Sequence, residues 1–402
     1  MNLNFKIVGA VAAVFVIALL GSWFFFGRSG GAPATQPQTF GTADTRTDAA
    51  IQEPEVPDTA QSESPGSQKV FKILDGPVAG ATFVQTLNPT TTIVRYVLAE
   101  SGRVFDFALD TPGAVPRALS NTTIPGISRV VWAGESAVMQ YLEQDTLKSL
   151  ALVLPLATTS SATIPAKIQF LPNNIIDIAA SPDGASIAYL LRTGAGADGY
   201  LARTDGTGAR KLFSLPLSRL LLSWPTANTL IAQAPPAFGI ETVAFSVAAQ
   251  SGAASPLLYA PSLSLNGDRM LGRFLYSTAG GPAGRVTYSH DVRSGLDSAL
   301  SFDPLPEQCV WSGLASSTAY CAAAAAYVPE NYADLRNSGE ISVAQQIVSY
   351  NAESLATLIA VPGGADGGIT SDIAALALDR SERYILFIKK GDRSLWGVRL
   401  TR

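Results

Sequence analysis

The sequence is poor in the residues that enzymes and metal sites use most often. Its 402 residues include one histidine, His290, and two cysteines, Cys309 and Cys321. A Ser-His-Asp hydrolase would depend on His290 alone, because that triad needs a histidine base. One histidine and two cysteines give at most three ligands, fewer than the four of a structural zinc site. We therefore assign no catalytic, cofactor-binding or metal-binding residue, and the sequence favours a protein that is not an enzyme.

Charge is also scarce. Only 15% of the residues are charged, and the formal net charge is −4. A nucleic-acid-binding protein carries surplus lysine and arginine to neutralise phosphates, and this chain has none, which argues against nucleic acid as a partner. Apolar residues make up 47%, with 35 glycines and 25 prolines. This composition is typical of many short strands joined by tight turns, and it predicts an all-β fold.

Carboxylate pairs are the one kind of acid–base chemistry that the composition leaves open. A glycosidase needs two Asp or Glu residues across a pocket. The candidates are spread along the chain: Asp106, Glu143, Asp177, Asp268 and Asp372. Their positions suit turn capping and solubility, so we expect structural roles for them.

One long apolar run lies at the N-terminus. Residues 7–27 carry no charge, and about 20 such residues in a helix cross a ~30 Å hydrocarbon layer. Trp23 and the phenylalanines after it suit a membrane interface. A cleaved signal peptide is the alternative, although its apolar region would be shorter. We expect residues 1–28 to form a single-pass anchor with the N-terminus in the cytoplasm and the remainder in the periplasm or outside the cell.

Residues 29–69 read as a linker. They are rich in Pro, Ser, Thr, Gly, Ala and acidic residues, and Phe40 is the only aromatic. Such a segment buries too little apolar surface to offset its ordering entropy. We expect it to hold a folded head, residues 70–402, away from the membrane.

The head contains a repeat. Strand, turn and strand recur at intervals of about 41 to 67 residues, and seven such units match one propeller blade each. The repeats are anchored near Leu87, Trp132, Ser181, Trp224, Leu265, Trp311 and Leu378. The last unit has three clear strands, and the extra strand at residues 70–74 is expected to complete it and close the ring. The longest interval predicts a loop or short helix at residues 329–342.

One copy of the repeat is close to a known pattern. It comprises Ser181-Pro182-Asp183-Gly184, Ile187-Ala188-Tyr189, Asp205-Gly206 and Lys211-Leu212. This block resembles the repeat of TolB-type β-propellers, which also occurs in the propeller domains of prolyl oligopeptidases. The resemblance implies a seven-bladed propeller that serves as a protein-interaction platform in the bacterial envelope, or as a filter beside a peptidase domain. No peptidase residue can be carried over, because no matching domain exists in this chain.

The cysteines and tryptophans have predicted structural roles. Cys309 and Cys321 lie about equally far from the centre of one hairpin, so they should oppose each other on paired strands within disulfide range. Two buried free thiols are the alternative. Three tryptophans share one place in the repeat, where we expect packing between blades: Trp132, Trp224 and Trp311. The alternative is an aromatic ring that binds sugar or peptide.

These observations favour a membrane-anchored propeller outside the cytoplasm. Its expected function is that of a non-catalytic scaffold for another envelope or surface protein. Two alternatives remain open at this point: a propeller that binds or cleaves glycans, and a regulatory partner of a separately encoded peptidase.

Overall fold

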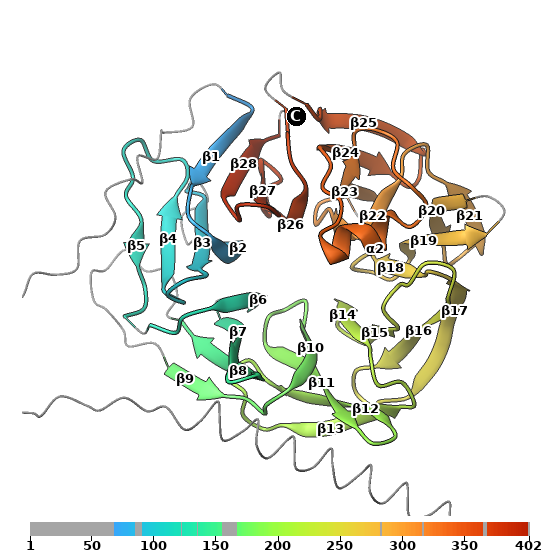
Figure 1. The fold of residues 1–402 in the computed structure, drawn as a ribbon, viewed down its shortest axis with the longest axis horizontal. Coiled ribbons are helices and arrows are strands. Elements are labelled where there is room, and N and C mark those ends of the chain that lie inside the picture. Colours follow the sequence, from blue (N-terminus) through green and yellow to red (C-terminus); the bar gives the residue numbers. More distant parts are fainter. Residues whose placement is uncertain are drawn as a thin grey trace, which may run out of the picture. The chain divides into compact units, whose positions relative to one another are not determined.

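The head folds as a seven-bladed β-propeller. The computed structural model describes residues 68–84, 91–121, 123–134, 136–154, 167–281, 284–315, 317–364 and 368–400. Their strands form seven antiparallel four-stranded sheets around a central axis (Figure 1). The expected anchor, residues 1–28, and linker residues 29–67 lie outside the described residues. Among those that are described, no helix has the length and apolar character needed to cross a membrane.

Each blade runs from an innermost to an outermost strand. Blade 1 consists of β2 (Val78–Val84), β3 (Ile93–Leu98), β4 (Val104–Ala108) and β5 (Arg117–Ala118). Blade 2 consists of β6 (Ile127–Ala133), β7 (Ser136–Glu143), β8 (Thr146–Val153) and β9 (Lys167–Phe170). Blade 3 consists of β10 (Ile175–Ala180), β11 (Ser186–Thr193), β12 (Gly196–Arg203) and β13 (Arg210–Leu215). Blade 4 consists of β14 (Leu221–Thr226), β15 (Thr229–Gln233), β16 (Glu241–Ala248) and β17 (Ala254–Pro261). Blade 5 consists of β18 (Ser264–Gly267), β19 (Arg273–Gly281), β20 (Gly284–Asp291) and β21 (Leu296–Ala299). Blade 6 consists of β22 (Pro304–Trp311), β23 (Thr318–Ala324), β24 (Gln345–Asn351) and β25 (Ala356–Val361). Blade 7 consists of β26 (Ile373–Leu378), β27 (Tyr384–Lys389), β28 (Leu395–Arg399) and β1 (Val70–Leu74).

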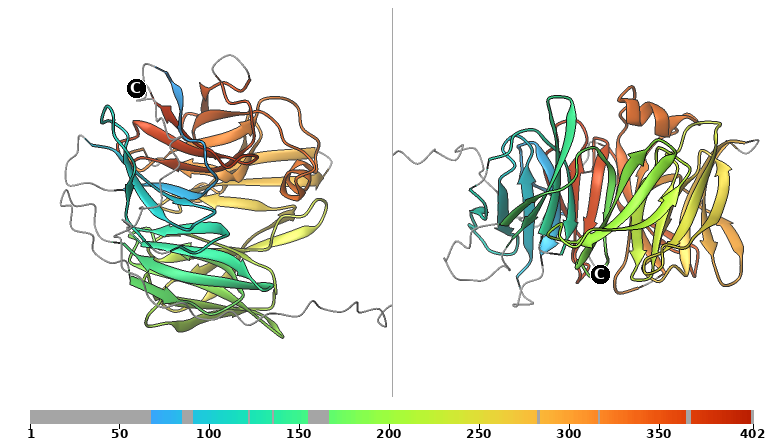
Figure 2. Two further views of the ribbon diagram at one scale, coloured as in Figure 1. Left: turned by 60° about the vertical axis from the view of Figure 1, so that its left-hand side comes forward. Right: turned by 90° about the horizontal axis from the view of Figure 1, so that it is seen from below.

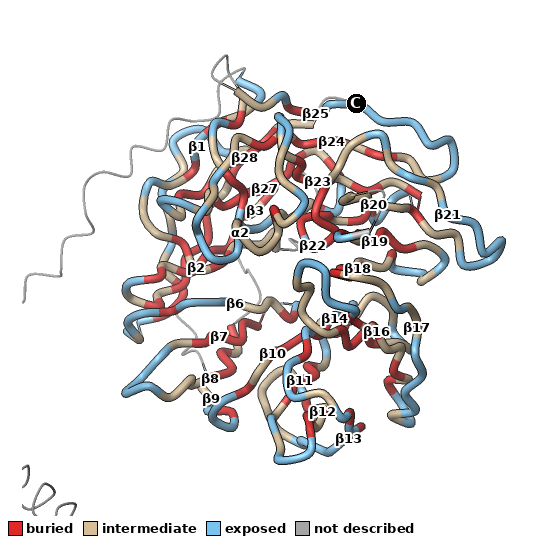
Figure 3. Tube along the Cα trace, turned by 45° about the vertical axis from the view of Figure 1, so that its right-hand side comes forward, coloured by how far each residue is buried: buried red, intermediate tan, exposed pale blue. Residues whose placement is uncertain are grey.

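The core lies between neighbouring blades. Leu190 of β11, Leu222 of β14 and Leu230 of β15 belong to one buried cluster that joins blades 3 and 4. Strands alternate their side chains between two faces, so a sheet that has a neighbour on each side buries residues on both faces. Buried positions accordingly concentrate on the inner and middle strands, while many positions on the outer strands are exposed (Figure 3).

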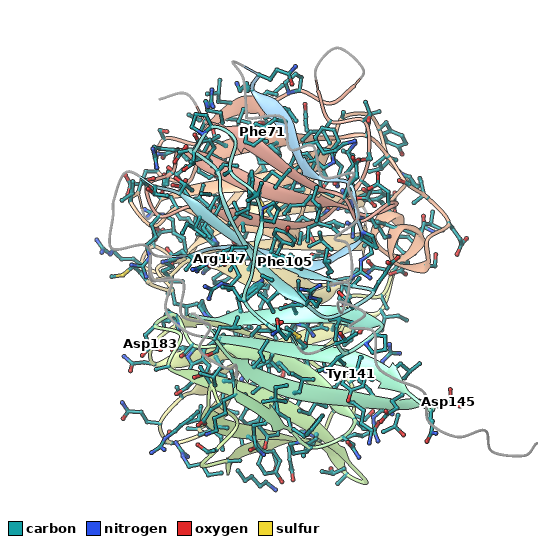
Figure 4. The ribbon with its side chains drawn as sticks, turned by 90° about the vertical axis from the view of Figure 1, so that its left-hand side faces the viewer. Phe71, Phe105, Arg117, Tyr141, Asp145 and Asp183 are labelled. Atoms are coloured by element: carbon teal, nitrogen blue, oxygen red, sulfur yellow. A yellow bond between two sulfur atoms is a disulfide. The ribbon has the colours of Figure 1, made fainter. Side chains whose placement is uncertain are left out.

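The Ser181–Gly184 turn joins β10 to β11 as its residue types predict. The Ser181 hydroxyl donates to the Asp183 carboxylate (2.5 Å), which also accepts from the backbone N–H of Ala185 (3.0 Å). Gly184 has φ +71°, and a Cβ there would lie 2.4 Å from the backbone nitrogen of Gly134. The turns of blades 2 and 3 therefore touch through their glycines, and Figure 4 marks Asp183 at this turn.

The repeat anchors fall where the innermost strands end. Six of the seven lie in or directly after an innermost strand: Trp132, Ser181, Trp224, Leu265, Trp311 and Leu378. Leu87 lies outside the described residues. The Ala322–Ala326 run begins as a strand, since β23 extends to Ala324.

The N-terminal strand closes the ring as expected. β1 pairs with β28, with Phe71 opposite Gly397. Phe71, labelled in Figure 4, is 5% exposed. Its ring packs edge-on against the Tyr384 ring. A Cβ on Gly397 would lie 2.4 Å from the Phe71 ring, so glycine is required there. The last blade thus combines residues from both ends of the head.

A hydrogen-bonded group also joins blade 7 to blade 1. Asp110 accepts from the Tyr384 hydroxyl (2.6 Å) and from the backbone N–H of Thr92 (3.1 Å), and the Arg383 guanidinium is 3.4 Å away. Burial alone would raise the pKa of Asp110. The hydrogen bonds from Thr92 and Tyr384 and the charge of Arg383 outweigh it, so the pKa lies below its usual value of 3.8.

We expect Asp110→Asn to change how the free energy of unfolding depends on pH. A carboxylate with a lowered pKa contributes stability above its unfolded pKa, and this contribution is lost as the pH falls through the folded pKa. The variant should be less stable by about 1 kcal/mol at neutral pH, and the difference should shrink below about pH 4. Urea unfolding from pH 3 to 7 measures this, and a difference independent of pH would contradict it.

Cys309 and Cys321 are joined by a disulfide in the structure. They oppose each other on β22 and β23 with their Cα atoms 4.0 Å apart. Cys321 is fully buried and Cys309 is 8% exposed. We expect no titratable thiol in the denatured chain when reductant is omitted, and two after reduction. Two thiols before reduction would contradict the bond.

Candidate functional site

The one helix among the described residues interrupts the repeat in blade 6. It is α2 (Tyr332–Ser338), part of residues 325–344 between β23 and β24, which we call the rim insertion. Figure 2 shows this helix projecting beyond the ends of the strands. Gly339 ends the helix with φ 83°, and its backbone N–H bonds to Arg336 and Leu335 carbonyls. The sequence predicted a loop or short helix at residues 329–342, and the structure confirms a helix inside that range.

The rim insertion is held by three other blades. The Asp334 carboxylate accepts from the backbone N–H of Phe238 in blade 4 (2.9 Å). The Arg336 guanidinium pairs with Asp372 (2.9 Å) and donates to the Ile373 carbonyl (2.5 Å), both of blade 7. Tyr332 is 1% exposed beneath the Arg285 guanidinium of blade 5, which lies 5.3 Å from its ring centre. The insertion is therefore a fixed part of this face.

Beside the insertion, two hollows form one groove between blades 5 and 6. Their volumes are about 440 and about 300 Å³. Both are lined by Arg285, Asp303, Ala324 and Ala326, and we call the combined space the blade 5–6 groove. Volumes of this size hold a small ligand or a few side chains of a polypeptide.

An ion pair forms the polar centre of the groove. The Arg285 side chain is 5% exposed and lies 2.6 Å from Asp303, whose side chain is 38% exposed. Burial lowers the pKa of Arg285 and raises that of Asp303, because it disfavours both charges, and each partner opposes the shift of the other. Thr287 also donates to Asp303 (3.0 Å). Asp303 is thus partly exposed in the groove, and Arg285 and Thr287 hold its carboxylate in place.

The rim of the groove is more open than its centre. Tyr327 is 92% exposed, and Glu330 lines the smaller hollow without an ion pair among the described residues. A separate cavity of about 20 Å³ beside α2 is lined by Arg285, Glu330 and three serines: Ser262, Ser264 and Ser277. This cavity can hold one water molecule. The arrangement offers an aromatic ring, carboxylates and a lining of mixed polarity, which suits contact with a polypeptide.

The predicted carboxylate candidates do not form a site together. Asp106 pairs with Arg95 in blade 1, Asp177 with Arg129 between blades 3 and 2, and Asp372 with Arg336. Asp268 accepts the backbone N–H groups of its own turn in blade 5, and Glu143 ends a hairpin in blade 2. The five lie in five different blades, and the contacts of Asp106, Asp177, Asp268 and Asp372 explain a structural role for these four.

His290 is part of a cross-strand pair. Its Nδ1 lies 2.9 Å from the Asp297 carboxylate on the neighbouring strand, and its ring stacks on Phe274 at 4.5 Å. No serine hydroxyl is recorded as its partner among the described residues. A stacked, paired histidine of this kind stabilises a sheet.

The three repeated tryptophans lie in the interior of the blades. Trp311 is 5% exposed, and Trp132 and Trp224 are partly buried against core clusters that span two blades. This agrees with packing between blades. None of these three tryptophans is fully exposed.

We expect Trp224→Ala to lower stability and to leave partner binding unchanged. A fully buried tryptophan costs about 3–5 kcal/mol on truncation. Trp224 is partly buried, so a loss of about 2 kcal/mol is expected. Denaturant unfolding gives the stability, and a binding assay at a temperature where both proteins are folded gives the second readout. Lost binding at unchanged stability would instead assign this side chain to a binding site.

Comparison with solved structures supports the fold. A chain in the crystal structure of a mitotic checkpoint complex has a TM-score of 0.50 at 13% identity, over 91% of this chain and 100% of that one. Kuenenia stuttgartiensis hydrazine synthase gives 0.49 at 10% identity, over 82% and 96% of the two chains. A puromycin hydrolase mutant gives 0.48 at 16% identity, over 78% and 50%. No family model and no curated protein matches the sequence. The likeness to the checkpoint-complex chain supports the fold alone.

The sequence located the insertion but not the groove. The long interval between repeat anchors marked where the pattern is broken. Nothing in the sequence showed that Arg285, Asp303 and Tyr332 lie close together. They belong to separate strands and loops that meet only when blades 5 and 6 pack together. Loops that depart from a repeated scaffold often carry function. That departure is the signal that could have directed attention to this face.

Proposed function

We propose that the protein is a membrane-anchored scaffold whose propeller binds another envelope or surface protein outside the cytoplasm. The observation that carries this proposal is the blade 5–6 groove beside the rim insertion. The insertion breaks the repeat, is fixed by several blades and exposes Tyr327 next to two hollows. Exposed tyrosines beside a pocket are typical anchors of protein interfaces.

The membrane part of the proposal is supported by the uncharged run at residues 7–27 and by the polar linker after it. The disulfide supports an oxidising compartment, because such bonds persist outside the cytoplasm. The Ser181–Gly184 turn and the strands around it support kinship with TolB-type propellers.

Photo-crosslinking tests the binding face. A photoreactive phenylalanine replaces Tyr327 in the full chain, and the control carries it at Tyr259 on the outer strand of blade 4, which is 63% exposed. We expect irradiation of living cells to give a discrete protein adduct at position 327 and none at position 259. The same products at both positions, or no adduct at 327, would contradict the proposed face.

A reporter fusion tests the location separately. Alkaline phosphatase needs disulfides for activity and is active only outside the cytoplasm. Fused after residue 402, it should be active in the full chain and lose activity when residues 1–28 are removed. Activity of a cytoplasmic reporter at the same position would place the head on the other side.

A further inference from the structure

The outermost strands of the seven blades differ in whether they carry a charged residue or a proline. An outermost strand exposes unpaired N–H and C=O groups, which can pair with another strand unless charge or proline prevents it. Six of the seven outermost strands contain such a residue: Lys72 in β1, Arg117 in β5, Lys167 in β9, Lys211 in β13, Pro256 in β17 and Asp297 in β21. These six edges are protected against association.

β25, the outer strand of blade 6, has no such protection. Its sequence from Ala356 to Val361 contains no charge and no proline. Leu358 is 68% exposed and Ile359 is 53% exposed. Consecutive residues of a strand point to opposite faces, so this edge is apolar on both faces.

The free edge of β25 favours a strand as its partner. Within the described residues, β25 pairs with β24 alone and leaves its other edge unpaired. The segment from Ala356 to Ile359 pairs regularly with β24, and the register shifts only after it. A regular edge of this kind supplies main-chain hydrogen bonds in register, and its side chains would pack beside those of the added strand.

We propose that β25 pairs antiparallel with β25 of a second copy of this chain and forms a two-fold dimer. A two-fold interface must be complementary to itself, and an uncharged apolar strand meets that condition without opposing like charges. The partner strand from a second copy could be any of its seven outer strands. Of these, β25 is the one that contains neither a charged residue nor a proline. The dimer joins two blades into one sheet and covers part of the exposed surface of Leu358 and Ile359. This proposal does not depend on the blade 5–6 groove.

The mass of the full chain in detergent, measured by light scattering with size exclusion, tests the dimer. The native protein should have the mass of two chains. Ile359→Lys places a charge on the edge and should weaken association by about tenfold or more. The control, Tyr259→Lys, adds the same charge to the outer strand of blade 4 and should leave the dimer intact. A single-chain mass for the native protein at the highest soluble concentration overturns the proposal, as does a dimer that survives both Ile359→Lys and Leu358→Lys.

Cysteine crosslinking gives a second readout that does not depend on mass. Both native cysteines are in the disulfide, so an introduced cysteine is the one free thiol of the described chain. Thr357→Cys should give a covalent dimer with a short bifunctional thiol reagent, which bridges the two copies whether position 357 pairs with itself or with a neighbouring position of β25. Ser255→Cys on the exposed start of β17 is the control and should remain a single chain. Equal crosslinking at both positions, or none at position 357, overturns the pairing.

Discussion

Removal of residues 70–74 is expected to open the propeller and to cause the largest loss of stability of any change considered. β1 supplies the fourth strand of the last blade, and its loss exposes the edge of β28 and the core beneath Phe71. Truncation of a buried phenylalanine alone costs about 3–5 kcal/mol, and the loss of the strand adds to this. A fall of about 10 °C or more in the melting temperature follows for a domain of this size.

Two single substitutions separate closure from a general effect of mutation in β1. Phe71→Ala should reproduce a large part of the loss, since the side chain packs against Tyr384 and Gly397. Lys72→Ala removes an exposed ion pair with Asp75 and should change stability by less than about 1 kcal/mol. An unchanged melting temperature after deletion of residues 70–74 would show that the strand does not hold the ring closed.

Arg336→Ala should release the rim insertion and destabilise the head by about 3–5 kcal/mol. Asp372 is fully buried, and the variant leaves its charge without the close guanidinium. Lys390 remains, but its Nζ lies 3.9 Å from the carboxylate, and burial lowers the pKa of Lys390. A buried carboxylate that has lost its partner is among the most costly defects a substitution can cause.

The matched control removes both charges. Arg336→Met with Asp372→Asn leaves no buried charge unpaired, so it should recover much of the stability lost in the single variant. Chemical denaturation of the native protein, Arg336→Met, Asp372→Asn and the double variant gives the coupling energy. Strictly additive losses would show that the two side chains act independently and that the pair does not fix the insertion.

The fold followed from features that each blade carries locally. The turn at Ser181–Gly184 sets a hairpin through its own side chains, and short alternating strands recur at the interval of one blade. Cys309 and Cys321 could be placed on opposite strands because a hairpin fixes its own register. Even the closing strand was predictable, since a final unit of three strands needs a fourth from elsewhere.

The groove and the carboxylate partners could not be obtained this way. Arg285 and Asp303 are joined by a contact that depends on how blade 5 turns into blade 6, and Asp372 is paired with an arginine in the insertion. A sequence shows neither the angle between blades nor which buried charges meet. The sequence therefore could not show the ion pairs of Asp106, Asp177 and Asp372.

Hydrogen exchange of the full chain tests the closed ring most directly. Backbone amides that are bonded within a cooperative core exchange only when that core opens. We expect a peptide covering residues 70–74 to keep protected amides that lose protection together with those of Tyr384–Lys389. Exchange of the whole 70–74 peptide within seconds, while the β27 peptide remains protected for hours, would contradict a ring closed by its first strand.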